Sequence, residues 1–498
     1  MTTTPDPPGL AMDEPAARWV LLATILGSGM ALLDGTVINV ALPSIGDDLG
    51  ADVAGLQWTL NGYLLPLAAL ILVGGAFGDR YGRRRLFVIG VVWFAAASVL
   101  CALAPSTEVL VAARALQGVG GALLTPNSLA IIQASFRRED RGAAIGAWSA
   151  LGGIAAAIGP LLGGYLVDAI SWRAVFFINL PMAAAVLVAT RRVPESRDDS
   201  AGGRPDLTGA LAAVIGLGGV TYALIEAPER GSTSAAVLTA GTLGAVGLVA
   251  FVIVERRGRS PMLPLDIFAS RQFTFANVIT FVVYGALGGV FFLLVVHLQG
   301  SLGYSPLEAG AASLPVTLLM LVGSPHAGRL SQRIGPKLPL TFGPLGIAAG
   351  MLLMVRITPG ASYAGAVLPA VLVFGAGLTL TVTPVTAAVL AAADDRHAGV
   401  ASGVNNAVAR AAGLLAVAVL PAAAGITGAA YADPAALTDG FRLAAVITAA
   451  LAASGGVLAA VTIDSSLATT GEEAASTHCG MDAPPPAIAA RVSGHPRR

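Results

Sequence analysis

An aspartate, Asp34, stands within a long apolar stretch, residues 19–43. An ionised carboxylate is costly in hydrocarbon unless a cation lies beside it. A carboxyl group in such a place suits the uptake and release of a proton. The weaker interpretation is that Asp34 is a structural residue that bends the helix or forms hydrogen bonds within it.

A second charge in an apolar segment is Arg114, which precedes Gln117 and three glycines, Gly118, Gly120 and Gly121. An arginine at the centre of a membrane helix costs about 2.5 to 3.5 kcal/mol on insertion scales, so it needs a partner or a water-filled passage. The alternative is that its long side chain reaches the membrane surface.

Two glycine-rich segments indicate roles in helix packing and in turns. Small residues let helices approach closely, and a proline inside a helix loosens its hydrogen bonding. In a loop, glycines allow tight turns, while an aspartate accepts from a helix N-terminus or an arginine. The apolar segment contains Gly159, Pro160, Gly163 and Gly164, and the basic loop contains Gly75, Asp79, Arg80, Gly82, Arg83 and Arg84.

The composition places these residues in a membrane. Of 498 residues, 55% are hydrophobic and 12% are charged, about half the charge of an ordinary soluble domain. The formal net charge is zero, which gives no reason to expect a nucleic-acid partner. Two cysteines suggest neither a disulfide framework nor a metal site, and no phosphate-binding loop is present. We therefore expect no enzyme activity and no cofactor, with a proton gradient as the energy source and no obligate protein partner.

A bilayer core about 30 Å thick needs about 20 apolar residues per helix. Windows of this length predict an all-α polytopic protein of about fourteen spans, at residues 19–43, 56–78, 86–104, 108–134, 142–167, 174–190, 207–226, 234–254, 273–299, 307–328, 338–356, 364–390, 398–422 and 441–462. Arginine and lysine gather in alternate loops, which predicts a multi-pass protein of the cytoplasmic membrane with both termini in the cytoplasm.

The basic loop is repeated later in the chain, as Gly328, Gln332, Arg333, Gly335 and Lys337 at the same spacing. Two related halves explain the repeat, and duplicated bundles with a site between them are a common transporter plan. The predicted parts are a cytoplasmic tail (1–17), an N-terminal six-helix bundle (18–190), a linker with two extra spans (191–270), a C-terminal six-helix bundle (271–462) and a disordered cytoplasmic tail (463–498).

These motifs resemble those of the major facilitator superfamily. The loop Gly75–Arg84 resembles its signature loop, and Arg114–Gly121 is similar to a motif whose arginine is associated with proton transfer. Residues 159–164 are similar to a motif found in antiporters, although Ala155 replaces a glycine upstream. The run 33–43 closely resembles the first span of the fourteen-span drug:proton antiporters, and the likeness covers nearly the whole chain.

The resemblance implies alternating access, with Asp34 and Arg114 in proton coupling. It implies that Asp79, Arg80 and Arg83 hold the cytoplasmic side shut in the outward-facing form. The expected cargo cavity includes Asp34, Asn39, Trp58, Asn61, Tyr63, Gln117 and Asn127.

Three further residues are weaker candidates. Glu226 is interpreted as an exposed carboxylate and His297 as a structural histidine. For Arg410, which lies in the span 398–422, structural and functional roles are equally favoured.

The expected function is proton-coupled efflux of small hydrophobic or cationic compounds, such as drugs or antibiotics. Asp34 is the only deep carboxylate expected, so a neutral or singly charged cargo is favoured over a dication. One alternative is an exporter of an endogenous metabolite, lipid or antibiotic. A membrane sensor that moves no cargo is less favoured.

Overall fold

The chain is described in a computed structural model, over residues 9–198, 205–258, 261–392 and 398–465. In this part, 13 helices are long and apolar enough to cross a membrane, and Ala174–Thr190 forms a shorter apolar helix. The prediction of an all-α polytopic protein is therefore confirmed. Most of the predicted C-terminal tail lies outside the described residues.

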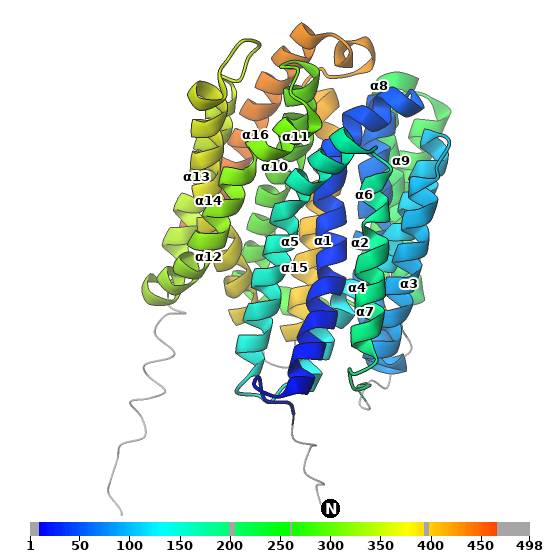
Figure 1. Ribbon diagram of the computed structural model, residues 1–498, viewed down its shortest axis with the longest axis vertical. Helices are drawn as coiled ribbons and strands as arrows, with labels where there is room; N and C mark the ends of the chain where they lie inside the picture. Colours follow the sequence, from blue (N-terminus) through cyan, green and yellow to red (C-terminus); the bar gives the residue numbers. More distant parts are fainter. Residues whose placement is uncertain (1–8, 199–204, 259–260, 393–397, 466–498) are drawn as a thin grey trace, which may run out of the picture.

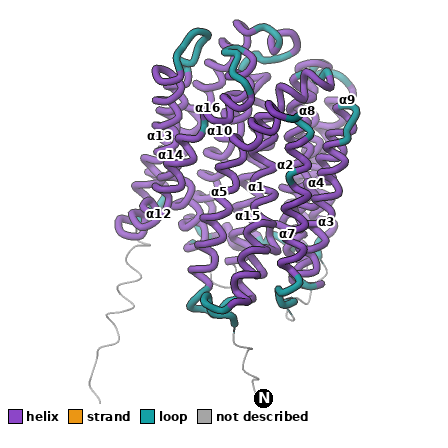
Figure 2. Tube along the Cα trace, in the orientation of Figure 1, coloured by secondary structure: helices purple, strands orange, loops and turns teal. Residues whose placement is uncertain are grey.

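Seven helices form the N-terminal half of the bundle (Figures 1 and 2). They are α1 (Pro15–Leu49), α2 (Val53–Tyr81), α3 (Arg83–Ala102), α4 (Thr107–Ser135), α5 (Arg141–Ala169), α6 (Ala174–Phe177) and α7 (Asn179–Thr190). Helix α1 packs on α4, α5 and α7, and α4 also packs on α2 and α3. We call the end at which α1 begins the proximal end, and the end at which it finishes the distal end.

The C-terminal half packs around α10 and α14. Its helices are α10 (Arg271–Gly300), α11 (Pro306–Ala312), α12 (Leu314–Ile334), α13 (Lys337–Met354), α14 (Leu368–Ala391), α15 (Ala398–Ala423) and α16 (Pro434–Thr462), with short turns at Leu265–Ala269, Tyr363–Val367 and Gly428–Tyr431. Between the halves, α8 (Leu207–Arg230) and α9 (Ala235–Arg257) form a hairpin. Helix α8 packs on α2 of one half and on α15 of the other.

Two predicted spans are interrupted helices, and a third begins with a wider helical turn. The breaks fall just before Pro181, between α6 and α7, and just before Pro315, between α11 and α12. The π-helical turn Tyr363–Val367 runs directly into α14, just before Pro369. A proline has no N–H to donate to the carbonyl one turn earlier, so the ladder of hydrogen bonds opens there. Hydropathy windows do not detect such breaks, because the apolar pattern continues through them.

The repeated basic loops have similar geometry. Helix α2 ends at Gly82, whose φ is 109°, and α12 ends at Gly335, whose φ is 81°. Residues with side chains rarely adopt such angles, so glycine suits both turns. Each loop then leads directly into the next helix.

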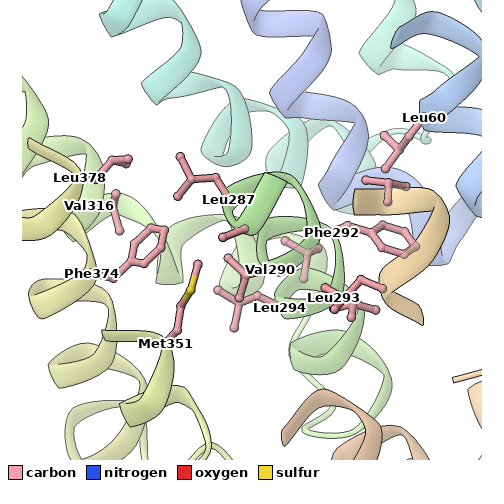
Figure 3. Packing of buried hydrophobic residues seen from close by; sticks show 14 of the residues in the cluster. Leu60, Leu287, Val290, Phe292, Leu293, Leu294, Val316, Met351, Phe374 and Leu378 are labelled. Atoms are coloured by element: carbon pink, nitrogen blue, oxygen red, sulfur yellow. The ribbon is translucent and has the colours of Figure 1, made fainter. Parts of the chain in front are cut away.

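The largest apolar core extends across both halves. Figure 3 shows Leu287, Val290 and Leu293 of α10 between Phe374 and Met351 on one side and Leu60 of α2 on the other. A smaller cluster lies within the N-terminal half. A third cluster joins α2, α8 and α15 through Ala54, Ile225 and Ala418.

Candidate functional site

Asp34 and Arg114 form a buried ion pair inside the N-terminal half. Nη1 of Arg114 lies 2.5 Å from Oδ2 of Asp34. The second carboxylate oxygen accepts from the side-chain amides of Gln117 (2.8 Å) and Asn179 (3.1 Å). The carboxylate therefore has donors on α4 and on α7, brought to α1 by helix packing.

The surroundings of Arg114 hold its guanidinium in place. Nε donates to the carbonyl oxygen of Thr59 at 3.1 Å, and Nη1 also donates to Gln117 at 2.6 Å. The ring of Tyr63 lies 4.5 Å from the guanidinium carbon, within the range of a cation–π contact. Nη2 is enclosed and has no partner among the described residues. One donor of this arginine is therefore unused in this conformation.

The pair is closed off from solvent. Asp34 is 3% exposed and Arg114 is 0% exposed. The predicted place of Asp34, as a lone carboxylate in the cargo cavity, is wrong for this conformation. The reason is that Asp34 faces α4 and α7 of its own half, where Arg114 neutralises it. Burying two charges is tolerated only with good geometry and further hydrogen bonds, which Gln117 and Asn179 provide.

Two members of the pair's network were not predicted. Asn179 begins α7, immediately after the break that precedes Pro181. Ser98 accepts from Gln117 at 2.9 Å and from Asn179 at 3.2 Å. A polar amide in the otherwise apolar segment 174–190 was the available signal.

The remaining residues of the expected cargo cavity do not form one site. Asn39 is half-buried, and its amide donates to Gly35 of its own helix. Asn127 donates to the carbonyl of Gly74 and packs against the backbone of α2. Asn61 is fully buried, and both of its amide atoms lack partners among the described residues. Only Tyr63 and Gln117 from the expected set lie beside Asp34 and Arg114.

Trp58 and Glu226 join α2 to α8 near the distal end. Nε1 of Trp58 donates to Glu226 at 2.9 Å, and the second carboxylate oxygen of Glu226 accepts from Arg230 at 2.5 Å. The Glu226 side chain is 12% exposed. The interpretation of Glu226 as an exposed carboxylate is therefore wrong, because Trp58 and Arg230 cover it.

The two other weak candidates lie in the C-terminal half. Nε2 of His297 is 3.0 Å from the carbonyl oxygen of Ile357, and its ring stacks on Phe441 with centroids 4.3 Å apart. These contacts are those of a structural histidine, as expected. Arg410 is half-buried near the middle of α15 and makes no direct hydrogen bond or ion pair with Asp34 or Arg114.

The basic loop at the proximal end is braced by residues of its own half. Asp79 accepts from Nε of Arg83 at 2.8 Å, and Arg80 lies over the ring of Tyr81. Glu195 accepts from the backbone N–H groups of Arg84 (2.9 Å) and Arg85 (3.1 Å) at the start of α3. The predicted role of the loop in holding the cytoplasmic side shut concerns another conformation and stays a prediction.

Replacing Glu195 with alanine is expected to destabilise this brace. The carboxylate accepts free N–H groups at a helix start as a capping residue does, and losing such a cap costs about 1 kcal/mol. The apparent melting temperature of the purified protein should fall by a few degrees, while transport stays near native because Asp79 and Arg83 remain paired. Glu139→Ala, at an exposed position, is the matched control. Native melting of Glu195→Ala would contradict the assignment.

The glycine motif on α5 contributes to the closed distal end. A side chain at Gly159 or Gly163 would strike Thr36 or Val37 of α1, so these glycines let α5 lie against α1. A Cβ at Gly164 would lie 2.6 Å from Cα of Leu307, at the start of α11 in the other half. Pro160 approaches the same helix, because its carbonyl faces Gly310. Gly159 and Gly163 therefore pack on α1 of their own half, whereas Pro160 and Gly164 pack on α11 of the other half.

Hydrogen bonds between the halves strengthen this closure. Asp168 accepts from the Ser305 hydroxyl and the Leu307 N–H, both at 3.0 Å. Gln57 donates to the carbonyl of Val417 at 2.6 Å, and Gln299 donates to the carbonyl of Val40 at 3.0 Å. All of these contacts are distal, and Figure 1 shows α12 diverging from α5 toward the proximal end. The structure is therefore a distally closed conformation.

A bundle of apolar helices in two halves, closed at one end and carrying a buried ion pair in one half, defines a multi-pass membrane transporter. A sequence profile of the Major Facilitator Superfamily matches residues 24–417, and the chain belongs to this family. The family resemblance inferred from the motifs is thereby confirmed.

Several relatives are drug or antibiotic resistance proteins. The chain is 37% identical over 388 residues to the multidrug resistance protein Stp of Mycobacterium tuberculosis, covering 78% of this chain and 72% of that protein. It is 37% identical over 465 residues to the puromycin resistance protein pur8 of Streptomyces alboniger, covering 91% and 92%. A tetracenomycin C resistance and export protein of Streptomyces glaucescens is 35% identical over 435 residues, covering 84% and 79%.

Solved structures show the same fold. A peptide transporter POT in complex with sulfate has a TM-score of 0.63 at 17% identity, covering 91% of this chain and 95% of that one. A bacterial homolog of the human lysosomal transporter Spinster, in an inward-facing and occupied conformation, has a TM-score of 0.59 at 20% identity, covering 91% and 98%. At these identities the likeness concerns the fold alone.

Proposed function

We propose that this protein exports small hydrophobic compounds, drugs or antibiotics among them, across the cytoplasmic membrane in exchange for protons. The names of its relatives support export and resistance. The observation that carries the proton coupling is the enclosed Asp34–Arg114 pair. A carboxyl group that can exchange its arginine for a proton changes the charge balance of one half of the transporter.

The proposed cycle assigns the distally closed form to the inward-facing state, with both termini in the cytoplasm. In this state Asp34 is a carboxylate held by Arg114, and cargo enters from the cytoplasm. In the outward-facing state the pair opens, Asp34 takes a proton from outside, and cargo leaves. Return to the inward-facing state releases the proton, because Arg114 then replaces it beside the carboxylate.

The pairing also bears on the charge of the cargo. A cationic cargo would need a carboxylate free to receive it, and Arg114 already occupies Asp34. The geometry therefore favours uncharged hydrophobic cargo over cations. This preference refines the expectation from sequence, which included cationic compounds.

A cell-based efflux measurement tests the proposed function. Cells expressing the protein should accumulate less of the neutral lipophilic dye Nile red than cells carrying an empty vector. A proton uncoupler should restore accumulation, whereas depletion of ATP with the proton gradient maintained should not. Lowered accumulation that persists in the uncoupler would remove proton coupling from the proposal.

Export of a compound that the host makes is a second candidate. It is favoured by relatives named as a tetracenomycin C resistance and export protein and as a probable actinorhodin transporter. Deleting the gene would then raise the amount of that compound inside the producing cell. Unchanged extracts from the deletion strain would favour a general drug exporter.

A further inference from the structure

Arg410 is a charged residue in the membrane-spanning region that the proton-coupling site does not use. It makes no hydrogen bond and no ion pair with any residue that the structure describes. Arg114, by contrast, has a carboxylate, an amide and a carbonyl around it. Arg410 is half-buried, and none of its nitrogens is among the enclosed polar atoms that lack a partner, so a ligand can reach the guanidinium. A cation at this depth of a membrane protein is stabilised by a negatively charged partner.

The position of Arg410 directs it toward the contact between the halves. Gly403 and Val417 lie two helical turns before and after it on α15, which puts all three on one helix face. A side chain at Gly403 would meet Leu72 of α2, and the carbonyl of Val417 accepts from Gln57 of α2. The face that carries Arg410 therefore meets the N-terminal half and does not meet lipid.

Arg410 lies near two phenol groups, one in each half. It interacts electrostatically with Tyr63 of α2 and with Tyr284 of α10. Tyr63 already donates to the carbonyl of Ala31. The Tyr284 hydroxyl has no hydrogen-bond partner among the described residues, so two donors, the Arg410 guanidinium and this hydroxyl, lack acceptors. Two donors in one region, both without an acceptor among the described residues, suit a ligand that brings an acceptor.

The helices around Arg410 supply no acidic side chain at its level. On α2 the acidic residue is Asp79, at the proximal end, and on α8 Glu226 and Glu229 are near the distal end. Asp34 of α1 is already paired with Arg114. Helix α10 contains no aspartate or glutamate at all. Among the described residues no free carboxylate lies beside Arg410, which leaves its guanidinium open to an anionic ligand.

We propose that Arg410, assisted by the Tyr284 hydroxyl, binds an acidic group of the cargo, such as a carboxylate or an ionised phenol, between the two halves. The inference rests on the proposed export function and adds hydrophobic acids to the uncharged cargo of that proposal. The inference also links the cargo site electrostatically to the proton site. Tyr63 interacts electrostatically with Arg410 and has its ring against Arg114, so an anion bound at Arg410 would change the electrostatic field at the Asp34–Arg114 pair.

Binding of three fluorescent probes to the purified protein in nanodiscs tests the inference. The probes are fluorescein, which is acidic, Nile red, which is neutral, and ethidium, which is cationic. The native protein should bind fluorescein more tightly than ethidium. Arg410→Gln should weaken fluorescein binding by about tenfold or more, since a charge-assisted hydrogen bond is lost, and should leave Nile red binding unchanged.

Two further variants control the result. Arg410→Lys keeps the charge and should retain much of the fluorescein affinity, while Arg356→Gln removes an exposed arginine of the same half and should change nothing. Native fluorescein affinity in Arg410→Gln, equal loss of Nile red binding, or a native protein that does not prefer fluorescein would each overturn the inference. The readout is separate from proton coupling, because Nile red export in an imposed pH gradient tests the proposed function alone.

Discussion

Asp34→Asn is expected to reduce pH-gradient-driven export from membrane vesicles to background. Asparagine has nearly the shape of aspartate but cannot take or release a proton, so the charge exchange between the proton and Arg114 is lost. The variant should also be less stable, by about 3 to 5 kcal/mol, because Arg114 would remain buried without its partner. Export and apparent melting temperature are measured on the same preparation.

A double variant separates stability from coupling. In Asp34→Asn/Arg114→Gln both charges are removed and neutral hydrogen-bonding groups remain, so the melting temperature should return close to native. Proton-driven export should stay absent. If the double variant, or Asp34→Asn itself, exported dye in response to a pH gradient at the native rate, Asp34 would have no part in coupling.

Gly164→Ala is expected to open the distal closure and to reduce export by about ten- to hundredfold. The added methyl group would lie 2.6 Å from Cα of Leu307 and 2.9 Å from its N, and backbone atoms at the start of α11 cannot yield as a flexible side chain would. Such overpacking costs about 1 to 3 kcal/mol. Only the distally closed conformation contains the clash, so the population shifts away from this conformation.

The control is Gly153→Ala on the same helix, where an added methyl group meets nothing within 4 Å. The readout is the distance between spin labels at Leu103 and Arg356, on exposed distal positions of the two halves, with both natural cysteines replaced. Gly164→Ala should populate a longer distance and Gly153→Ala should not. Native distances and native export in Gly164→Ala would show that α5 and α11 do not form the closure.

The spans could be read from sequence because length and hydropathy decide them. The predicted window 56–78 lies within α2 (Val53–Tyr81), and the window 108–134 lies within α4 (Thr107–Ser135). The interruptions escaped prediction, although Pro181 was visible. A proline breaks a helix at one position and is accommodated as a bend at another, as Pro66 is within α2, and packing decides between them.

The candidate site was predicted only in part. Asp34 and Arg114 were each identified as costly charges, but their pairing depends on how α1 rotates against α4, which hydropathy does not determine when nearly every face is apolar. For the same reason Asp34 was placed in a cargo cavity although it faces its own half. Asn179 was missed because its role depends on the break that precedes α7.

The most direct test of the central claim counts protons exchanged when cargo binds to the purified protein. Nile red is added to the protein in weakly buffered solution over a series of pH values, and proton release is followed with a pH indicator. The native protein should release up to roughly one proton for each dye bound, because the dye shifts protonated molecules toward the inward-facing state, in which Arg114 replaces the proton on Asp34. Asp34→Asn/Arg114→Gln should bind the dye and release none. Equal release by both proteins would contradict the account.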